Sequence, residues 1–285
     1  MIIFRLFRHK YPVPDRWDDF TPENADKFVH LCRAFELFET GKIDFNQLKV
    51  AVTAALLGLD VSMVPYQNDI LAENIWRLNE RLQFPFKLVE NEDGSRTVSV
   101  NVVLKTNLFP RIHRRKGYRF RITKEGMVDC NITAEQYTEA ISLMELYTRT
   151  RKGDVLDRLA VTLYPGLDKA PYAYKLASYY NFRGILEWIR NLPDFRLIFT
   201  PGEKKSGSGS PLGLSGTIFT LSKSGYGTLK EIQKLDLFSY LGALVQLNID
   251  GIYSLQSAGL KPGEIAEKMN LPLECVMPYL SVKGE

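Results

Sequence analysis

The densest group of side chains able to bind a ligand is a basic cluster between residues 111 and 121. Its candidate contacts for an anionic partner are Arg111, Arg114, Arg115, Lys116, Arg119 and Arg121. Several cations on one edge can hold a phosphate backbone, because their binding releases its counterions. A charged, solvated edge strand explains the same residues, and so does an acidic surface on a protein partner.

Aromatic residues alternate with the last two arginines of this cluster. Tyr118 and Phe120 flank Arg119, and Arg121 follows. Successive side chains of a strand point to opposite faces, so we expect a strand that buries the rings and exposes Arg119 and Arg121.

The residue types that catalysis requires are sparse. His9, His30 and His113 are the three histidines of the chain, and none has a Ser, Cys or Asp companion at an interpretable spacing. The carboxylates near helix starts, such as Asp44 and Asp154, are explained as caps. No spacing typical of metal ligands occurs. We therefore predict no catalytic, cofactor-binding or metal-binding residues and a protein that is not an enzyme.

A glycine- and serine-rich stretch runs from Gly202 to Gly216. Glycines allow backbone N–H groups to converge on an anion. However, the spacing fits neither the phosphate loop of nucleotide hydrolases nor the dinucleotide-binding fingerprint. We predict a mobile loop, in which Leu212 and Leu214 are either packed onto the body or available to a partner.

The C-terminal segment from Leu255 to Leu280 resembles a helix-turn-helix. Ile265 and Ala266, the turn residue Asn270, then Leu271 and Val276 have the spacing of two crossing helices. The helix that would read DNA departs from the pattern, since Pro272 replaces the usual Ser or Thr cap. Its outward residues are Leu273, Glu274, Met277 and Pro278. Bases are read chiefly by Arg, Lys, Asn and Gln, so this pattern favours a helical interaction module over a DNA reader.

An internal duplication sets the expected scaffold. Thr21 to Asp60 and Thr133 to Asp168 each begin with Thr-x-Glu, contain Ala-Val-Thr and end with Gly-Leu-Asp. A Trp-bearing helix and a Phe-basic-Leu-aliphatic segment then follow in each copy. Chance recurrence of helix caps and apolar periods is the alternative. Such a repeat changes the expected fold more than any single motif.

Caps and periodicity locate the expected elements. Thr21, Asp44 and Thr133 have the pattern of N-caps, and Gly58 of a helix end. The period changes toward two between residues 86 and 122, which predicts a small antiparallel sheet. We expect a first strand or an apolar arm at residues 1–8, a strand at residues 195–199 and a helix over residues 229–247.

Together these patterns predict a mainly α protein with a small antiparallel β component. We expect a tandem duplicated helical scaffold followed by a helix-turn-helix-like unit, with limits at 1–129, 130–250 and 251–285. The composition, 45% hydrophobic and 25% charged with a net charge of +4, is that of a soluble protein. Its three cysteines are widely spaced and suit a reducing cytoplasm. No apolar run is long enough for a membrane span.

Two segments resemble uncharacterised proteins of bacterial prophage tail modules. One is Pro14-Asp15-Arg16-Trp17-Asp18-Asp19-Phe20-Thr21, in which Phe20 replaces the usual Leu. The other is Ser224-Gly225-Tyr226-Gly227 before a helix. The resemblance implies a structural or assembly-chaperone role and identifies no catalytic residue.

Two functions remain open at the level of sequence. The first is a non-enzymatic interaction or assembly protein with a protein partner and no cofactor. The second is a DNA-associated protein that uses the basic strand at residues 111–121 and the C-terminal unit. The position of the basic strand relative to the last helix separates them.

Overall fold

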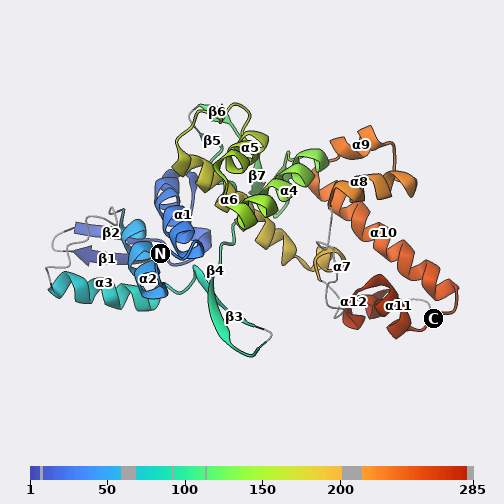
Figure 1. Ribbon diagram of the computed structural model, residues 1–285, viewed down its shortest axis with the longest axis horizontal. Coiled ribbons are helices and arrows are strands. Elements are labelled where there is room, and N and C mark those ends of the chain that lie inside the picture. The colour runs from blue at the N-terminus through green and yellow to red at the C-terminus, as the bar shows by residue number, and fades with distance from the viewer. Residues whose placement is uncertain (7–8, 59–68, 92, 113, 201–213, 281–285) are drawn as a thin grey trace.

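Helices form most of the chain in the computed structural model (Figure 1), which confirms the mainly α fold class with a small antiparallel β component. The structure describes residues 1–285 except 7–8, 59–68, 92, 113, 201–213 and 281–285. The α-helices of the described residues are α1 (Ala25–Glu39), α2 (Phe45–Leu57), α3 (Asp69–Arg81), α4 (Ala134–Thr150), α5 (Gly153–Leu163), α6 (Tyr172–Arg190), α7 (Arg196–Phe199), α8 (Leu214–Lys223), α9 (Leu229–Lys234), α10 (Leu237–Ser257), α11 (Pro262–Met269) and α12 (Leu273–Leu280).

Strands occur as separate antiparallel pairs in the described chain. The pairs are β1 (Ile2–Leu6) with β2 (His9–Val13), β3 (Phe86–Glu90) with β4 (Arg96–Val100), β5 (Arg111–Ile112) with β6 (Arg115–Lys116), and β7 (Phe120–Ile122) with β8 (Val128–Cys130). The strand expected at the N-terminus is β1. The small sheet expected between residues 86 and 122 is therefore divided into hairpins, with an isolated bridge between Thr106 and Arg121.

The two expected copies each contain three helices in the same order. In the first copy α2 packs against both α1 and α3, and in the second α5 packs against both α4 and α6. Helices α1 and α6 also pack together, so the two sets share one hydrophobic core. The order of elements agrees with a duplication as far as the third helix, and common origin stays a prediction.

The agreement ends after the third helix. Strand β3 follows α3, but the expected strand at residues 195–199 is wrong, because this segment is a 3-10 turn (Pro193–Phe195) followed by α7. Pro193 stands in the first turn, where its fixed φ suits helical geometry. The helical turn also buries Leu197 against the C-terminal helices. The apolar and basic pattern of residues 195–199 does not reveal this contact, because the contact depends on the tertiary fold.

The single helix expected over residues 229–247 is also wrong. The segment forms two helices, α9 and α10. Between them Leu235 is extended with ψ 141°, and Asp236 caps α10. The Asp236 carboxylate accepts hydrogen bonds from the N–H groups of Phe238 and Ser239, at 3.0 and 3.1 Å. Because the extended Leu235 frees its carbonyl, that carbonyl accepts the N–H of Ala134 at 2.8 Å and ties the break to α4.

Two of the expected helix starts agree with the sequence. Asp44 accepts the backbone N–H of Gln47 at 2.8 Å, and the Gln47 side chain returns a bond to the Asp44 N–H. Thr133 and Gln136 make the same reciprocal pair at the start of α4. Gly58 ends α2 with φ +74°, a conformation that glycine adopts without a Cβ penalty. Two expected caps are wrong in position: Asp154 lies in the first turn of α5, whose N-cap is Lys152, and Thr21 begins a 3-10 turn (Pro22–Asn24) before α1, whose N-cap is Asn24.

A cluster of charges joins the two helical sets at the end of α1. The Glu39 carboxylate accepts hydrogen bonds from Arg151 at 2.9 Å, Arg183 at 2.6 Å and the Tyr180 hydroxyl at 2.8 Å. One turn earlier, Glu36 accepts from Tyr147 at 3.2 Å. These bonds link α1 to α4 and α6, so the seam between the sets is polar at one end and apolar elsewhere.

The C-terminal helices form a second, smaller core. Ile252 of α10, Ile265 and Ala266 of α11, and Cys275 and Val276 of α12 are buried together. Asn270 makes the turn with φ +52°, as the helix-turn-helix spacing predicts. Helix α12 continues through Pro278 to Leu280, so the proline does not end it. The three-helix unit is thus formed.

Shared elements connect the three expected units. The limit at residue 129 falls within β8, and the limit at residue 250 falls within α10. Helix α10 contributes to the main core near its start and to the second core near its end.

Within the described ranges, no helix combines the length and the hydropathy that crossing a bilayer requires.

Candidate functional site

Four of the six predicted cationic residues lie on one hairpin. Strands β5 and β6 pair Arg111 with Lys116 and Ile112 with Arg115. Arg114, in the turn, has φ +66°. All four basic side chains are exposed, whereas Ile112 is buried. We call Arg111, Arg114, Arg115 and Lys116 the cationic hairpin. Among the described residues, no carboxylate lies within ion-pair distance of these four cations.

Close packing fixes the hairpin to the body. A Cβ on Gly117 would lie 2.0 Å from Cε1 of Tyr164, so only glycine allows the chain to pass this ring. The Arg115 side chain lies against Gly166, where a Cβ would be 3.1 Å from its Nε. The hairpin base therefore sits on the connection between α5 and α6.

The other two predicted residues belong to a different element. Arg119 precedes β7 and Arg121 lies within it, and both bind Asp129 of β8, at 2.6 and 3.0 Å. Tyr118 and Phe120 are buried, as the alternation predicts. The basic strand expected over residues 111–121 is therefore wrong as a single strand. The turn at Arg114 and the break between β6 and β7 separate a hairpin whose cations have no carboxylate partner among the described residues from a strand with paired charge.

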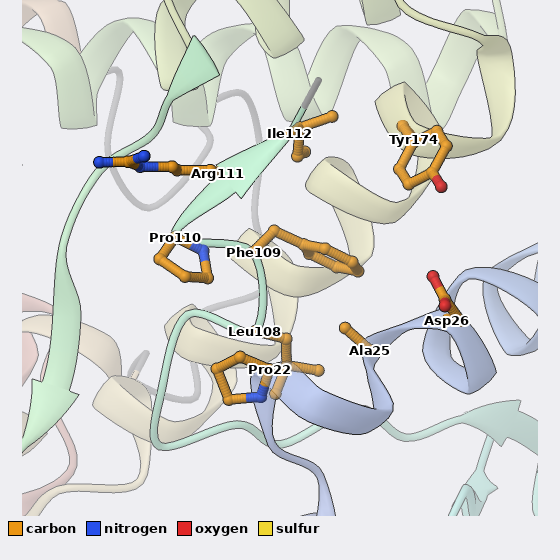
Figure 2. Close-up of a pocket in the computed structure, with 9 residues that line it drawn as sticks. All are labelled: Pro22, Ala25, Asp26, Leu108, Phe109, Pro110, Arg111, Ile112 and Tyr174. Atoms are coloured by element: carbon orange, nitrogen blue, oxygen red, sulfur yellow. The ribbon is translucent and has the colours of Figure 1, made fainter. Parts of the chain in front are cut away.

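A pocket of about 490 Å³ opens at the base of the cationic hairpin. Its buried floor contains Ala25, Leu108, Phe109 and Ile112, and Tyr174 is half-buried. Its exposed rim contains Pro22, Asp26, Pro110 and Arg111. Figure 2 shows Phe109 at the centre, Asp26 and Tyr174 on one side, and Arg111 directed outward on the other. We call this cavity the hairpin pocket.

Two buried asparagines hold the wall of the hairpin pocket. The Asn181 side chain accepts the N–H of Leu108 at 3.0 Å, and the Asn107 side chain accepts the N–H of Phe109 at 2.9 Å. The two amides also bond to each other at 3.0 Å, and Asn181 donates to the Tyr118 hydroxyl at 2.6 Å. Buried polar groups that are fully paired fix one conformation. The pocket wall is therefore preorganised.

Tyrosines around these amides stay protonated. Burial raises the pKa of Tyr118 well above its ordinary value, and burial likewise raises the pKa of Tyr164. Tyr164 donates its hydroxyl proton to Asn107 at 3.0 Å. Both hydroxyls thus serve as neutral hydrogen-bonding groups and supply no anionic base at neutral pH.

The arrangement suits binding better than bond chemistry. An apolar floor with a charged rim accommodates an aliphatic or aromatic side chain and orients the groups beside it. Burial raises the pKa of the Cys32 thiol, and burial raises that of Cys130 to about 11, so neither is a thiolate nucleophile at neutral pH. The part of the chain that the structure describes contains no group of three His, Cys, Asp or Glu side chains placed to hold a metal.

Sequence reasoning located the rim of the hairpin pocket but not its floor. Arg111 was predicted, whereas Ala25, Leu108, Phe109 and Tyr174 were not. The run Leu108-Phe109-Pro110 beside a basic cluster was the local signal. Contact with α1 and α6 depends on the fold, so spacing alone could not predict the cavity.

The other predicted partner contact is only partly within the described structure. Leu212 lies outside the described residues, as does most of the predicted loop. Leu214 is the first residue of α8, so the expected loop end at Gly216 is wrong.

The C-terminal unit lies away from the cationic hairpin. Figure 1 shows β5 and β6 at the upper edge of the molecule and α11 and α12 at the lower right. On α12, Leu273 and Met277 are exposed, at 48% and 45%. The two elements that the DNA-associated interpretation requires therefore do not form one surface.

Comparisons with known proteins add no family. No protein-family model matches the sequence, and no curated protein or solved structure is significantly similar to it.

Proposed function

We propose that the protein is a non-enzymatic interaction or assembly protein that binds an acidic segment of a protein partner. The hairpin pocket receives an apolar side chain of that segment, and the cationic hairpin binds the carboxylates beside it. The observation that carries the proposal is the position of Arg111, which belongs both to the pocket rim and to the cationic hairpin.

The two parts of the site contribute differently. Burying a Leu or Phe side chain contributes about 1.5 to 3 kcal/mol, whereas an exposed ion pair contributes about 0 to 1 kcal/mol. The pocket therefore supplies most of the affinity. The four cations speed the encounter and select acidic partners.

DNA association is the weaker proposal. The cationic hairpin could contact phosphates, but its four charges are few and α12 presents Leu273 and Met277 rather than base-reading side chains. An assembly role agrees with the resemblance to prophage tail-module proteins, which supplies no residue of the site.

A selection from a displayed random-peptide library tests the proposal. The bait is the full chain, and a variant with Arg114→Glu and Arg115→Glu serves as counter-bait. We expect enriched peptides with one Leu, Ile, Phe or Trp flanked by Asp or Glu. Their affinity for the charge-reversed variant should fall at least about tenfold, because favourable ion pairs become repulsive.

A matched control changes charge elsewhere. Lys230→Glu on α9 alters an exposed cation far from the site (Figure 1) and should leave peptide affinity unchanged. Phe109→Ala should weaken binding through the pocket floor. Enrichment of peptides without carboxylates, or binding that ignores both the charge reversal and Phe109→Ala, contradicts the proposal. A short DNA duplex that binds more tightly than any selected peptide would favour DNA association.

A further inference from the structure

The β3–β4 hairpin projects from the lower edge of the molecule (Figure 1). Its base is fixed, because Phe86 packs edge-on against Phe45 with ring centroids 5.2 Å apart and Lys87 binds Glu187 at 3.1 Å. Beyond the base, Leu88 and Val89 are 69% and 38% exposed. Because successive side chains of a strand point to opposite faces, Leu88 and Val89 are two separate exposed apolar side chains, and Leu88 is the more exposed of the two.

Acidic residues follow these apolar side chains. Glu90 ends β3, and Asp93 lies in the turn, where it accepts hydrogen bonds from the Ser95 hydroxyl at 2.6 Å and the Ser95 N–H at 2.9 Å. These bonds hold the Asp93 pKa below its ordinary value, so the carboxylate stays ionised. Residues 88–98 contain three carboxylates and one arginine.

The cationic hairpin on one side of the hairpin pocket has the opposite pattern, and Asp26 lies on the other side of the rim. Residues 109–118 contain three arginines, one lysine and no carboxylate. The floor beside them is apolar, with Leu108, Phe109 and Ile112 buried. The β3–β4 hairpin thus carries both features that the pocket is expected to recognise, an exposed apolar residue and adjacent carboxylates.

We infer that the partner in this site is a second copy of the chain, whose β3–β4 hairpin places Leu88 in the hairpin pocket and its carboxylates beside the cationic hairpin. The inference rests on the proposed function, because it names the partner of the same site.

Geometry requires contact between different copies. The β3–β4 hairpin and the cationic hairpin lie at opposite edges of the molecule (Figure 1), so a hairpin cannot reach the pocket of its own chain. Each copy therefore offers one hairpin and one pocket. Such a head-to-tail contact leaves both features free at the ends of a pair and continues into a ring or a filament.

Two variants that each remove one half of the contact test the inference. The hairpin variant combines Leu88→Ser with Asp93→Lys, and the pocket variant combines Arg114→Glu with Arg115→Glu. All four positions are exposed, so the fold should be kept, and circular dichroism checks this. Sedimentation velocity over a range of concentrations is the readout, with Lys230→Glu as the control.

The average mass of the sedimenting species should rise with protein concentration for the wild type and for Lys230→Glu. Each variant alone should associate at least about tenfold more weakly, because it lacks one half of the contact. An equal mixture of the two variants should form one-to-one dimers and nothing larger, since only one productive contact remains. A reciprocal twofold dimer would give the same mixed pair but would stop at two copies in the wild type, so wild-type assemblies larger than a dimer indicate the head-to-tail contact.

A wild type that remains monomeric, or variants that associate as the wild type does, would overturn the inference. The peptide selection distinguishes a failure of self-association from a failure of the proposed function. If acidic peptides with an apolar residue still bind through Arg114 and Arg115, only self-association is wrong. If that selection fails as well, the proposed function fails with it.

Discussion

Two carboxylates in this molecule each bind two arginines, but in different surroundings. Glu39 binds Arg151 and Arg183, whose side chains are 23% and 31% exposed. Asp129 binds Arg119 and Arg121, which are 52% and 64% exposed. The first cluster joins helices more than 100 residues apart, whereas the second joins neighbouring strands. The same chemistry thus holds the scaffold together in one place and sets surface charge in the other.

The largest difference between the clusters should appear when the charge is removed without a change in shape. Glu39→Gln leaves two partly buried guanidiniums without an anion, so we expect the free energy of unfolding to fall by about 3 kcal/mol. Urea unfolding followed by circular dichroism measures it. Asp129→Asn is the matched control. A cost no larger for Glu39→Gln than for Asp129→Asn would remove the distinction between the clusters.

Acid should narrow the stability gap between the wild type and Glu39→Gln. Burial alone would raise the Glu39 pKa, but Arg183, Arg151 and Tyr180 together hold it below its ordinary value of 4.5. A carboxyl with a lowered folded-state pKa contributes fully above the unfolded value and loses its contribution as pH falls through the folded value. We expect the gap to be constant near neutrality and to shrink below about pH 4.5. A gap that widened in acid would show the opposite sign.

A smaller loss should follow removal of one hydroxyl from the buried cluster. Tyr180→Phe deletes the donor to Glu39 at 2.8 Å and keeps the buried ring. We expect a cost of about 1 kcal/mol. Combining it with Glu39→Gln in a double-mutant cycle isolates the coupling between the two residues. Additive losses would mean that the hydroxyl does not act through Glu39.

The smallest stability effect should come from the exposed cluster. Asp129→Asn is expected to leave the melting temperature nearly unchanged, because exposed ion pairs contribute little. It frees the charge of Arg119 and Arg121, so affinity for acidic peptides should rise, by less than about threefold at physiological salt. Calorimetry and fluorescence anisotropy measure the two quantities. A fall in peptide affinity would place Asp129 within the binding surface itself.

The sequence predicted those elements that depend on neighbouring residues. The reciprocal caps at Asp44 and Thr133 require only residues three positions apart, and the turn at Asn270 requires only a short loop. The exposure of Arg119 and Arg121 followed from strand alternation. These signals do not depend on contacts between distant segments, so the sequence alone predicts them.

The remaining features depend on contacts between distant segments. Residues 195–199 form a helix because Leu197 finds a buried place against the C-terminal helices, and the break before Asp236 is tied to α4. The partners of Glu39 come from α4 and α6, and the floor of the hairpin pocket comes from segments about 80 residues apart. No local pattern encodes such pairings.

Helix α10 has a consequence for the order in which the chain folds. Helices α11 and α12 have eight residues each, too few to persist alone in water. Their core is completed by Ile252 near the end of α10, whose start is buried in the main core through Leu237, Tyr240 and Leu241. We therefore expect the main core to form first and α10 to extend from it as a template, on which the last two helices condense.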